Sequence, residues 1–183
     1  MKSLITVLFF WLLTLSPVFA VVESVNAECP VTYDVGFSPR GNALNLILTE
    51  LATATESISL AAYSFTSLPV ADALIAAQKR GVAVSVVVNK GSINGLGAKA
   101  RYLQNNEVPV RMNAKYTIMH NKFFLVDNKS LKTGSFNYSA AAAARNAENI
   151  IIIRCAEDVI ADYQQEFTRL WDESVEIPEL PAS

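Results

Sequence analysis

Side chains that bind metal ions are scarce in this sequence. It contains one histidine and two cysteines in 183 residues. Cys29 and Cys155 do not have the close spacing of zinc ligands. Asp127 and Glu148, the carboxylates near the histidine, are too few and too far apart in sequence to predict a metal cage. The sequence therefore predicts no metal site.

Signatures of nucleotide cofactors and of repeats are absent as well. The Gly-rich stretch at residues 91–97 lacks both the dinucleotide-binding spacing and the Lys and Ser/Thr of a P-loop. We interpret it as a surface loop and expect no cofactor. The chain has no internal repeat, and its length suits one compact domain.

Long hydrophobic runs are missing outside the N-terminus. Residues 4–15 are apolar, follow Lys2 and end at a Ser-Pro pair, which is typical of a signal peptide and too short for a comfortable membrane span. We predict a signal peptide over residues 1–27, with cleavage after Ala20 or Ala27. The mature chain would then be periplasmic or secreted, with no membrane span. An uncleaved N-terminal anchor is the alternative.

The two cysteines have a second consequence if the chain is exported. Cys29 lies just before the first predicted strand, and Cys155 lies at the end of a late one. An oxidising compartment permits a disulfide between them, which would fasten the N-terminus of the mature chain. Two unpaired thiols are the alternative that the sequence leaves open.

Acidic residues are rare in the middle of the chain. Between Lys79 and Arg145 the only acids are Glu107 and Asp127, whereas acids predominate after Arg145. A basic middle favours a surface that binds a polyanion, and ordinary solvated charge is the alternative. The basic residues of this stretch are Lys79, Arg80, Lys90, Lys99, Arg101, Arg111, Lys115, Lys122, Lys129, Lys132 and Arg145.

Hydrophobic periodicity and turn residues predict alternating strands and helices, which indicates a layered α/β fold. We expect one domain over residues 28–176 and a loose tail over 177–183. The expected strands are 32–37, 57–63, 82–88, 108–111, 122–127, 130–133 and 148–154, the last of them fully buried. The expected helices are 42–53 (capped by Asn42), 69–80, 98–105, 139–145 (capped by Ser139) and 157–171.

The single histidine lies in a segment suited to phosphate chemistry. His120 and Lys122 are two residues apart, so a strand would direct both side chains from the same face. A neutral imidazole can attack phosphorus, and an ammonium can neutralise a phosphoryl oxygen. Ser135 and Asn137 add hydrogen-bond donors, and Gly134 lets the backbone approach closely.

These residues match the pattern HxKxxxxDxxxxxxGSxN without a gap. The chain therefore resembles the phospholipase D superfamily, and in particular its small exported bacterial endonucleases with a single copy of the motif. The resemblance covers nearly all of the mature chain. It implies an α/β fold with a mixed, largely parallel sheet flanked by helices on both faces.

The resemblance also implies roles for the residues. His120 would be the nucleophile that forms a phosphohistidine, and Lys122 would bind phosphate in a pocket lined by Ser135, Asn137 and Gly134. Glu148 would accept a hydrogen bond from the imidazole and fix its tautomer. Asp127, the remaining acidic position of the motif, is expected to pin the turn after its strand.

The presence of only one histidine predicts a homodimer. The reaction needs a nucleophile and a general acid, and full-length relatives supply two histidines from two motifs. Here a second copy of the chain would supply the second His120, across a twofold interface that contains the active site.

The substrate stays open at this point. We expect metal-independent hydrolysis of DNA or RNA with little sequence preference, because the basic middle suits backbone contacts. Tyr116, Phe65 and Tyr138 could stack on bases, although core packing is the more ordinary role. One alternative is a phospholipase D acting on head-group phosphodiesters, with Phe65, Ile118 and Met119 as an apolar lip. Another is a catalytically silent module that binds nucleic acid.

Overall fold

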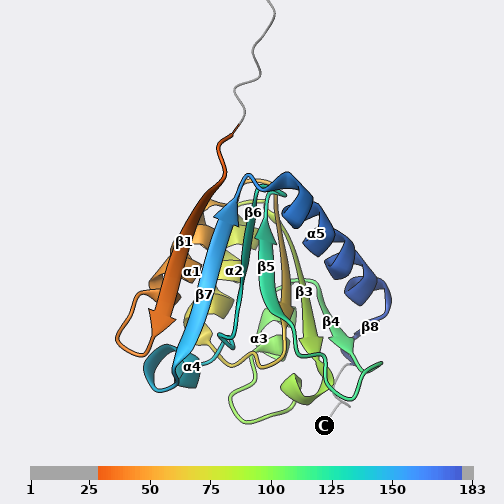
Figure 1. The fold of residues 1–183 in the computed structure, drawn as a ribbon. Coiled ribbons are helices and arrows are strands. Elements are labelled where there is room, and N and C mark those ends of the chain that lie inside the picture. The colour runs from red at the N-terminus through yellow and green to blue at the C-terminus, as the bar shows by residue number, and fades with distance from the viewer. Residues whose placement is uncertain (1–28, 179–183) are drawn as a thin grey trace, which may run out of the picture.

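The computed structural model describes residues 29–178, so the predicted signal peptide and residues 179–183 lie outside the described residues. One eight-stranded sheet carries helices on both faces (Figure 1). The strands are β1 Thr32–Ser38, β2 Ser57–Ala62, β3 Ala83–Asn89, β4 Val110–Asn113, β5 Lys122–Val126, β6 Ser130–Gly134, β7 Glu148–Arg154 and β8 Val175–Glu176. The helices are α1 Ala43–Thr53, α2 Leu68–Lys79, α3 Ala100–Gln104, α4 Ala140–Ala144 and α5 Glu157–Asp172, with a short 3-10 helix, η1, at Lys90–Ser92.

Local signals explain where several helices begin. At α2 the Ser67 side chain accepts a hydrogen bond from the Val70 N–H, and at α4 Ser139 accepts one from Ala142. The expected cap by Ser139 is thus confirmed. Asn42 occupies the cap position of α1, but its side chain makes no capping hydrogen bond, so that detail of the prediction is wrong.

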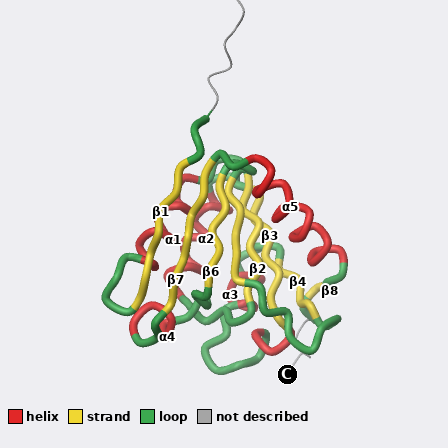
Figure 2. Tube along the Cα trace, in the orientation of Figure 1, coloured by secondary structure: helices red, strands yellow, loops and turns green. Residues whose placement is uncertain are grey.

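The sheet is mixed, as expected, with strand order β1-β7-β6-β5-β2-β3-β4-β8. Its parallel share is smaller than expected, because only the β2–β3 and β3–β4 pairs are parallel. Short connections join β5 to β6, and antiparallel neighbours are what such hairpins produce. Figure 2 shows the strands side by side, with α1 and α2 behind them.

Two hydrophobic cores hold the helices to the sheet. The larger core joins α1 and α2 to one face, and the smaller joins α5 to the opposite face. The burial of these side chains is the main stabilising contribution. The α5 side contains Ala61, Val87, Met119, Phe123, Leu125, Leu131, Ile160, Phe167 and Leu170.

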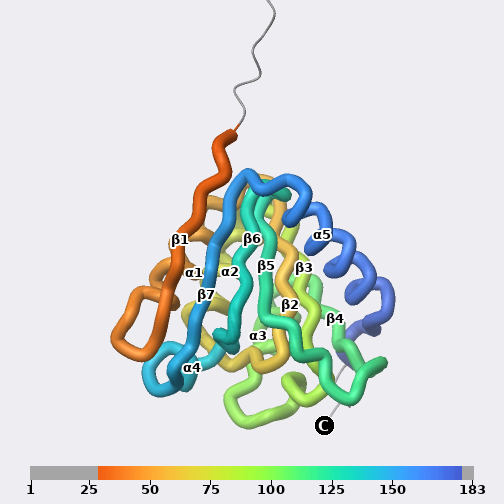
Figure 3. Tube along the Cα trace, viewed as in Figure 1, coloured from red at the N-terminus to blue at the C-terminus, as the bar shows by residue number. Residues whose placement is uncertain are grey.

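On the face packed by α5, the outer part of the sheet is uncovered (Figure 3). Tyr33, Val35 and Phe37 of β1 are 68%, 42% and 60% exposed. Their cross-strand neighbours Ile151 and Ile153 on β7 are half-buried, so the expectation of a fully buried strand was wrong there. The helix α5 packs on the strands further across the sheet and leaves these five side chains open. We call them the open apolar strip.

Both ends of the described segment are fastened to this domain. A disulfide joins Cys29 to Cys155, with 5.7 Å between the two Cα atoms, which resolves the question left open by the sequence. Ile177 is buried in the larger core and its carbonyl accepts a hydrogen bond from Gln104. The domain therefore extends further than residue 176, and Ile177 does not belong to a loose tail. Between residues 29 and 178, no helix has the length and apolar character that a bilayer crossing requires.

Candidate active site

The motif residues, with one exception, gather along the side of the sheet that is formed by strand ends, which is not an edge strand. This motif edge is where β1, β2, β3 and β6 end and where β5 and β7 begin, as their antiparallel registers require. Lys122 starts β5 and His120 lies in the loop just before it, Ser135 and Asn137 come from the segment after β6, and Glu148 comes from the start of β7.

Tyr63 brings His120 and Lys122 together. The strand β5 begins only at Lys122, so His120 lies in the preceding loop and the expected shared strand face does not apply to it. The His120 ring packs against Tyr63 with 4.4 Å between ring centroids. The Lys122 Nζ lies 5.2 Å from the Tyr63 centroid and donates to the His120 carbonyl at 2.7 Å. Sequence reasoning did not assign Tyr63 to the site, because its place depends on the pairing of β2 with β5.

The loop that carries His120 is fixed on both sides of this residue. The Met119 N–H donates to the side chain of Asn89 at 3.0 Å, and both residues are buried. The Tyr63 N–H donates to the Asn121 carbonyl at 2.9 Å. These contacts hold the loop while His120 itself stays exposed to solvent.

The Gly-Ser-Phe-Asn segment after β6 lies tightly against β7. Gly134 has a φ of +137°, and a Cβ there would lie 2.3 Å from the Asn149 carbonyl oxygen, so only glycine fits. The Ser135 hydroxyl donates to Glu148 at 2.6 Å and accepts from the Asn149 N–H at 3.1 Å. Asn137 is half-buried, and its side-chain oxygen has no hydrogen-bond partner among the described residues.

Contrary to the expectation, Glu148 does not accept a hydrogen bond from the His120 imidazole. Its carboxylate accepts hydrogen bonds from Ser135 and from the Asn146 amide, at 2.6 and 3.0 Å. In the described part of the chain no hydrogen bond joins Glu148 to His120. The pairing of β6 with β7 places Ser135 beside the Glu148 carboxylate. The Ser135 hydroxyl therefore donates the hydrogen bond that we expected from the imidazole.

The aromatic residues suggested for base stacking do not form an open platform. Phe65 and Tyr138 are fully buried and pack edge-to-face, which confirms core packing as their more ordinary role and leaves neither ring open for stacking. Tyr116 is 38% exposed, but its hydroxyl is bonded to Glu173 and Arg169. The packing of Phe65 against Tyr138 joins the loop after β2 to the Gly-Ser-Phe-Asn segment.

Asp127 is the exception, because it lies at the far end of β5. Its carboxylate accepts hydrogen bonds of 2.8 to 2.9 Å from the backbone N–H groups of Thr55, Glu56 and Ser57, and from the Thr55 hydroxyl. Partial burial raises the pKa of Asp127, but these hydrogen bonds outweigh it and hold the pKa below its usual value. The structure does not bring Asp127 to the motif edge, and its contacts fit a role in pinning the turn.

Replacing Asp127 with asparagine is expected to lower the free energy of unfolding by about 1–2 kcal/mol, because hydrogen bonds to a charged acceptor are the stronger kind. The lowered pKa of Asp127 means that its contribution is present above the unfolded value of about 3.9 and is lost as pH falls through the folded value. Urea unfolding at pH 7 and pH 3 should show the difference from wild type shrinking in acid. A large loss of turnover in a fully folded variant would contradict this structural role.

Two lysines near the site have lowered pKa values. Partial burial lowers the pKa of Lys122, and the negative charge of Glu148 opposes this. Burial, together with the positive charge of Lys122, lowers the pKa of Lys132 to about 7, and the negative charge of Glu148 again opposes this. Lys132 was counted with the basic surface, but it is fully buried.

Four cations that form no ion pair among the described residues lie at the motif edge, whereas Lys79 and Arg80, which also form none, lie at the far end of α2. Arg40 follows β1, Lys90 follows β3 and Arg145 precedes β7, while the Lys99 N–H donates to the Phe65 carbonyl shortly after β2; within residues 29–178 none of the four forms an ion pair. We call these four residues the cationic rim. Several other basic residues of the expected surface are engaged elsewhere: Lys115 pairs with Glu173, Arg111 stacks on Trp171, and Lys129 lies beyond the far end of β5.

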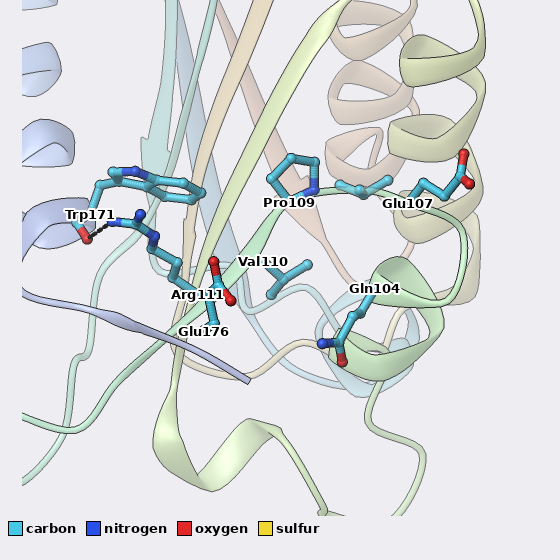
Figure 4. A pocket seen from close by; sticks show the side chains of 8 residues that line it. Gln104, Glu107, Pro109, Val110, Arg111, Trp171 and Glu176 are labelled. Atoms are coloured by element: carbon cyan, nitrogen blue, oxygen red, sulfur yellow. Dashed lines mark hydrogen bonds between the residues drawn. The ribbon is translucent and has the colours of Figure 1, made fainter. Parts of the chain in front are cut away.

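A hollow of about 260 Å³ lies away from the motif edge, between β4, β8 and the end of α5 (Figure 4). The Arg111 guanidinium lies over the Trp171 ring at 4.4 Å from its centroid and donates to the Trp171 carbonyl. The lining contains none of the motif residues, so this hollow is not the candidate active site. Among the described residues, no cluster of three or more metal-binding side chains occurs.

A mixed eight-stranded sheet that presents a histidine, a lysine and a Gly-Ser-x-Asn segment at one edge is the arrangement of a phospholipase D-like α/β protein. A family profile described as "Cardiolipin synthase, PLD-like domain" matches residues 47–171. The chain belongs to the phospholipase D superfamily.

Similar proteins are named phospholipase D, cardiolipin hydrolase and Nuc. A phospholipase D of Rickettsia bellii is 38% identical over 121 residues, which are 66% of this chain and 60% of that protein. A mitochondrial cardiolipin hydrolase of Xenopus laevis is 31% identical over 176 residues, covering 94% of this chain and 79% of that one. The crystal structure of Nuc from Salmonella typhimurium, a phospholipase D family member, has a TM-score of 0.78 and 33% identity, and the match covers 82% of this chain and all of Nuc.

Proposed function

We propose that this protein is a metal-independent phosphodiesterase that hydrolyses nucleic acid through a phosphohistidine on His120. The observation that carries the proposal is the exposed His120 ring held beside Lys122 on the Tyr63 ring, at the edge of the sheet that also bears the cationic rim. An imidazole nitrogen attacks phosphorus, and the bond from phosphorus to the leaving oxygen breaks. Lys122 and the donors of the Gly-Ser-Phe-Asn segment stabilise the charge on the phosphoryl oxygens.

Both steps of the reaction need a second group, an acid and then a base, that the single chain lacks. The leaving oxygen must gain a proton, and a water molecule must then lose one as it attacks the phosphohistidine and restores the free imidazole. The sequence contains one histidine. We therefore propose a twofold dimer in which the partner's His120 acts as the acid and then as the base.

The open apolar strip supports this dimer. Its side chains would leave water when covered, which favours association. The strip runs along β1 to Phe37, which pairs with Asn149 directly beside Glu148 at the motif edge. A second copy that covers the strip about a twofold axis running along the strands would place its own motif edge next to this one. The strip and the need for a second histidine both favour a copy of this chain as the occupant.

Export is part of the proposal. The pattern over residues 1–27 predicts it, and the Cys29–Cys155 disulfide is the kind of bond that persists in a periplasm or outside the cell. A disulfide in the protein isolated from its native compartment would agree with export, and free thiols there would count against it.

Nucleic acid is the substrate class that we propose, because the residues of the cationic rim form no ion pair among the described residues and are therefore available to bind phosphate groups. Lys99→Met combined with Arg145→Met should raise KM for plasmid DNA about tenfold at low salt and should make cleavage less dependent on salt, because fewer counterions are released. Hydrolysis of the small diester bis(p-nitrophenyl) phosphate should change little. Lys129→Met, which alters a lysine beyond the far end of β5, is the matched control and should behave as wild type.

Phospholipid is the second candidate, and one observation favours it. Ile118 is 50% exposed two residues before His120, and Leu96 in the Gly-rich loop is fully exposed. Phe65 and Met119, the other expected members of an apolar lip, are buried. A lipid enzyme would lose hydrolysis of vesicles in an Ile118→Asp variant while keeping hydrolysis of the small diester.

The deciding experiment treats the purified protein, in EDTA, with plasmid DNA, RNA and phosphatidylcholine vesicles, with His120→Ala beside it. We expect cleavage of DNA or RNA by the wild type and none by the variant. Cleavage of vesicles alone would overturn the nuclease proposal. Cleavage that EDTA abolishes would overturn the metal-independent mechanism, and nucleic acid binding without cleavage would indicate a silent binding module.

A further inference from the structure

Lys132 is a buried cation without an acidic hydrogen-bond partner. It lies on β6, three residues before Ser135, and its side chain is fully shielded from solvent. Among the described residues it forms no ion pair, although a buried ammonium costs free energy unless its charge is compensated. An apolar side chain would fill this core position at lower cost. A lysine at a buried position where its charge is costly points to a role in function.

The contacts of Lys132 connect the two halves of the motif. Its Nζ donates to the carbonyl of Lys122 at 3.2 Å and to the carbonyl of Phe136 at 3.4 Å. The first carbonyl belongs to the strand that carries the phosphate-binding lysine. The second belongs to the Gly-Ser-Phe-Asn segment, between Ser135 and Asn137. One ammonium therefore links the backbones of both segments.

Aromatic rings complete the surroundings of this ammonium. The Nζ lies 4.7 Å from the ring centroid of Tyr138 and 5.7 Å from that of Phe136, where a ring face attracts a cation. The charged groups that act on it are Lys122 from β5 and Glu148 from β7. Burial raises the pKa of Tyr138 far above its usual value, so that phenol stays neutral. The positive charge of Lys132 therefore lies behind the proposed phosphate site, and it adds to the charge of Lys122 within that site.

We propose that Lys132 is a positioning residue of the active site: its buried ammonium clamps the start of β5 to the Gly-Ser-Phe-Asn segment and adds positive charge behind the bound phosphodiester. The inference rests on the proposed function and deepens it. Lys132 touches no substrate. Its protonated form holds Lys122, Ser135 and Asn137 in the geometry that the phosphoryl oxygens require, and loss of its proton releases the clamp.

The test compares wild type, Lys132→Met and Lys132→Arg on bis(p-nitrophenyl) phosphate between pH 5.5 and 9, with His120→Ala as the inactive reference. Because Lys132 has a pKa of about 7, wild-type kcat/KM should fall as pH rises through that value. Lys132→Met should lose about tenfold to hundredfold at pH 6, as a small displacement of positioning groups can cause, and should lack this alkaline fall. Lys132→Arg keeps its charge, so it should recover activity and hold it above pH 7.

Thermal melting separates this role from a purely structural one. An unfolded lysine has a pKa of about 10.4, so between pH 7 and 10 the unfolded state binds more protons and wild-type stability rises with pH. At pH 6 wild type must bury a charged lysine, which costs folding free energy, whereas Lys132→Met buries no charge. The variant should therefore melt above wild type at pH 6, although it is less active, and its stability should lack this rise with pH. Activity and melting temperature lost together, with the alkaline fall retained, would overturn the inference.

Other outcomes distinguish the inference from the proposed function. A wild type without activity toward any phosphodiester means that the proposed function fails. An active wild type and an inactive His120→Ala, with Lys132→Met equal to wild type in rate and pH profile, means that only the inference fails. If Lys132→Met does not fold, Lys132→Arg decides alone, because an alkaline fall that persists in it contradicts the role of Lys132.

Discussion

Replacing His120 with alanine is expected to lower kcat toward phosphodiesters by a factor of about 10⁴ or more, because the variant loses both the nucleophile and the acid of a symmetric site. The ring is exposed and packs against the Tyr63 ring, so its removal should leave the fold intact. Far-UV circular dichroism and the melting temperature should therefore match wild type. Initial rates with DNA and with bis(p-nitrophenyl) phosphate measure the effect.

A pair of lysine variants provides the matched control for this loss. Lys122→Met removes the cation beside His120, whereas Lys129→Met removes an exposed lysine whose ion pair with Glu56 spans 3.8 Å. The first should lose most of its activity and the second none. Equal behaviour of the two would mean that charge near His120 is not what the reaction uses.

Mixing wild type with an excess of the His120→Ala variant is expected to inhibit the wild type. A mixed dimer has a single histidine, so it lacks either the nucleophile or the acid. With a ninefold excess of the variant and free exchange of subunits, about one tenth of the wild-type chains remain in fully active dimers. Activity per wild-type chain should fall to about that fraction. A chain that catalyses alone would keep its full rate in the same mixture.

The interface can be tested with two edge-strand valines. Val35 on β1 belongs to the open apolar strip and is 42% exposed, and Val175 on β8, at the opposite end of the sheet, is 56% exposed. Val35→Asp should give an inactive monomer in analytical ultracentrifugation, because a charge in an apolar interface is costly. Val175→Asp should stay dimeric and active. A fully active Val35→Asp monomer would contradict the shared site.

Much of this account could be predicted from sequence because its signals are local. Turn residues and periodicity placed seven of the eight strands and the five α-helices within a few residues, although β8 and η1 were missed, and the spacing of the motif indicated the superfamily without any coordinates. Asp127 has the structural contacts expected of it, but they tie its turn to the N–H groups of residues 55–57 around the start of β2, a distant segment that no local signal indicates.

The rest depends on pairing between distant segments. Tyr63 reaches His120 only because β2 pairs with β5, and Glu148 bonds Ser135 only because β6 pairs with β7. Lys132 looks like one more surface charge in the sequence, because no local pattern shows that its side of β6 lies under the larger core. The open side of β7 was missed for a related reason: four consecutive isoleucines give no sign that α5 covers only part of the sheet.

The central claim is a transient bond between His120 and phosphorus, and mass spectrometry of the acid-sensitive intermediate tests it most directly. Enzyme mixed with a slow phosphodiester and quenched under alkaline conditions within milliseconds should carry the phosphoryl fragment on the peptide that contains His120. The account predicts that this adduct forms and decays at rates matching turnover. Steady turnover with no adduct on that peptide would contradict it.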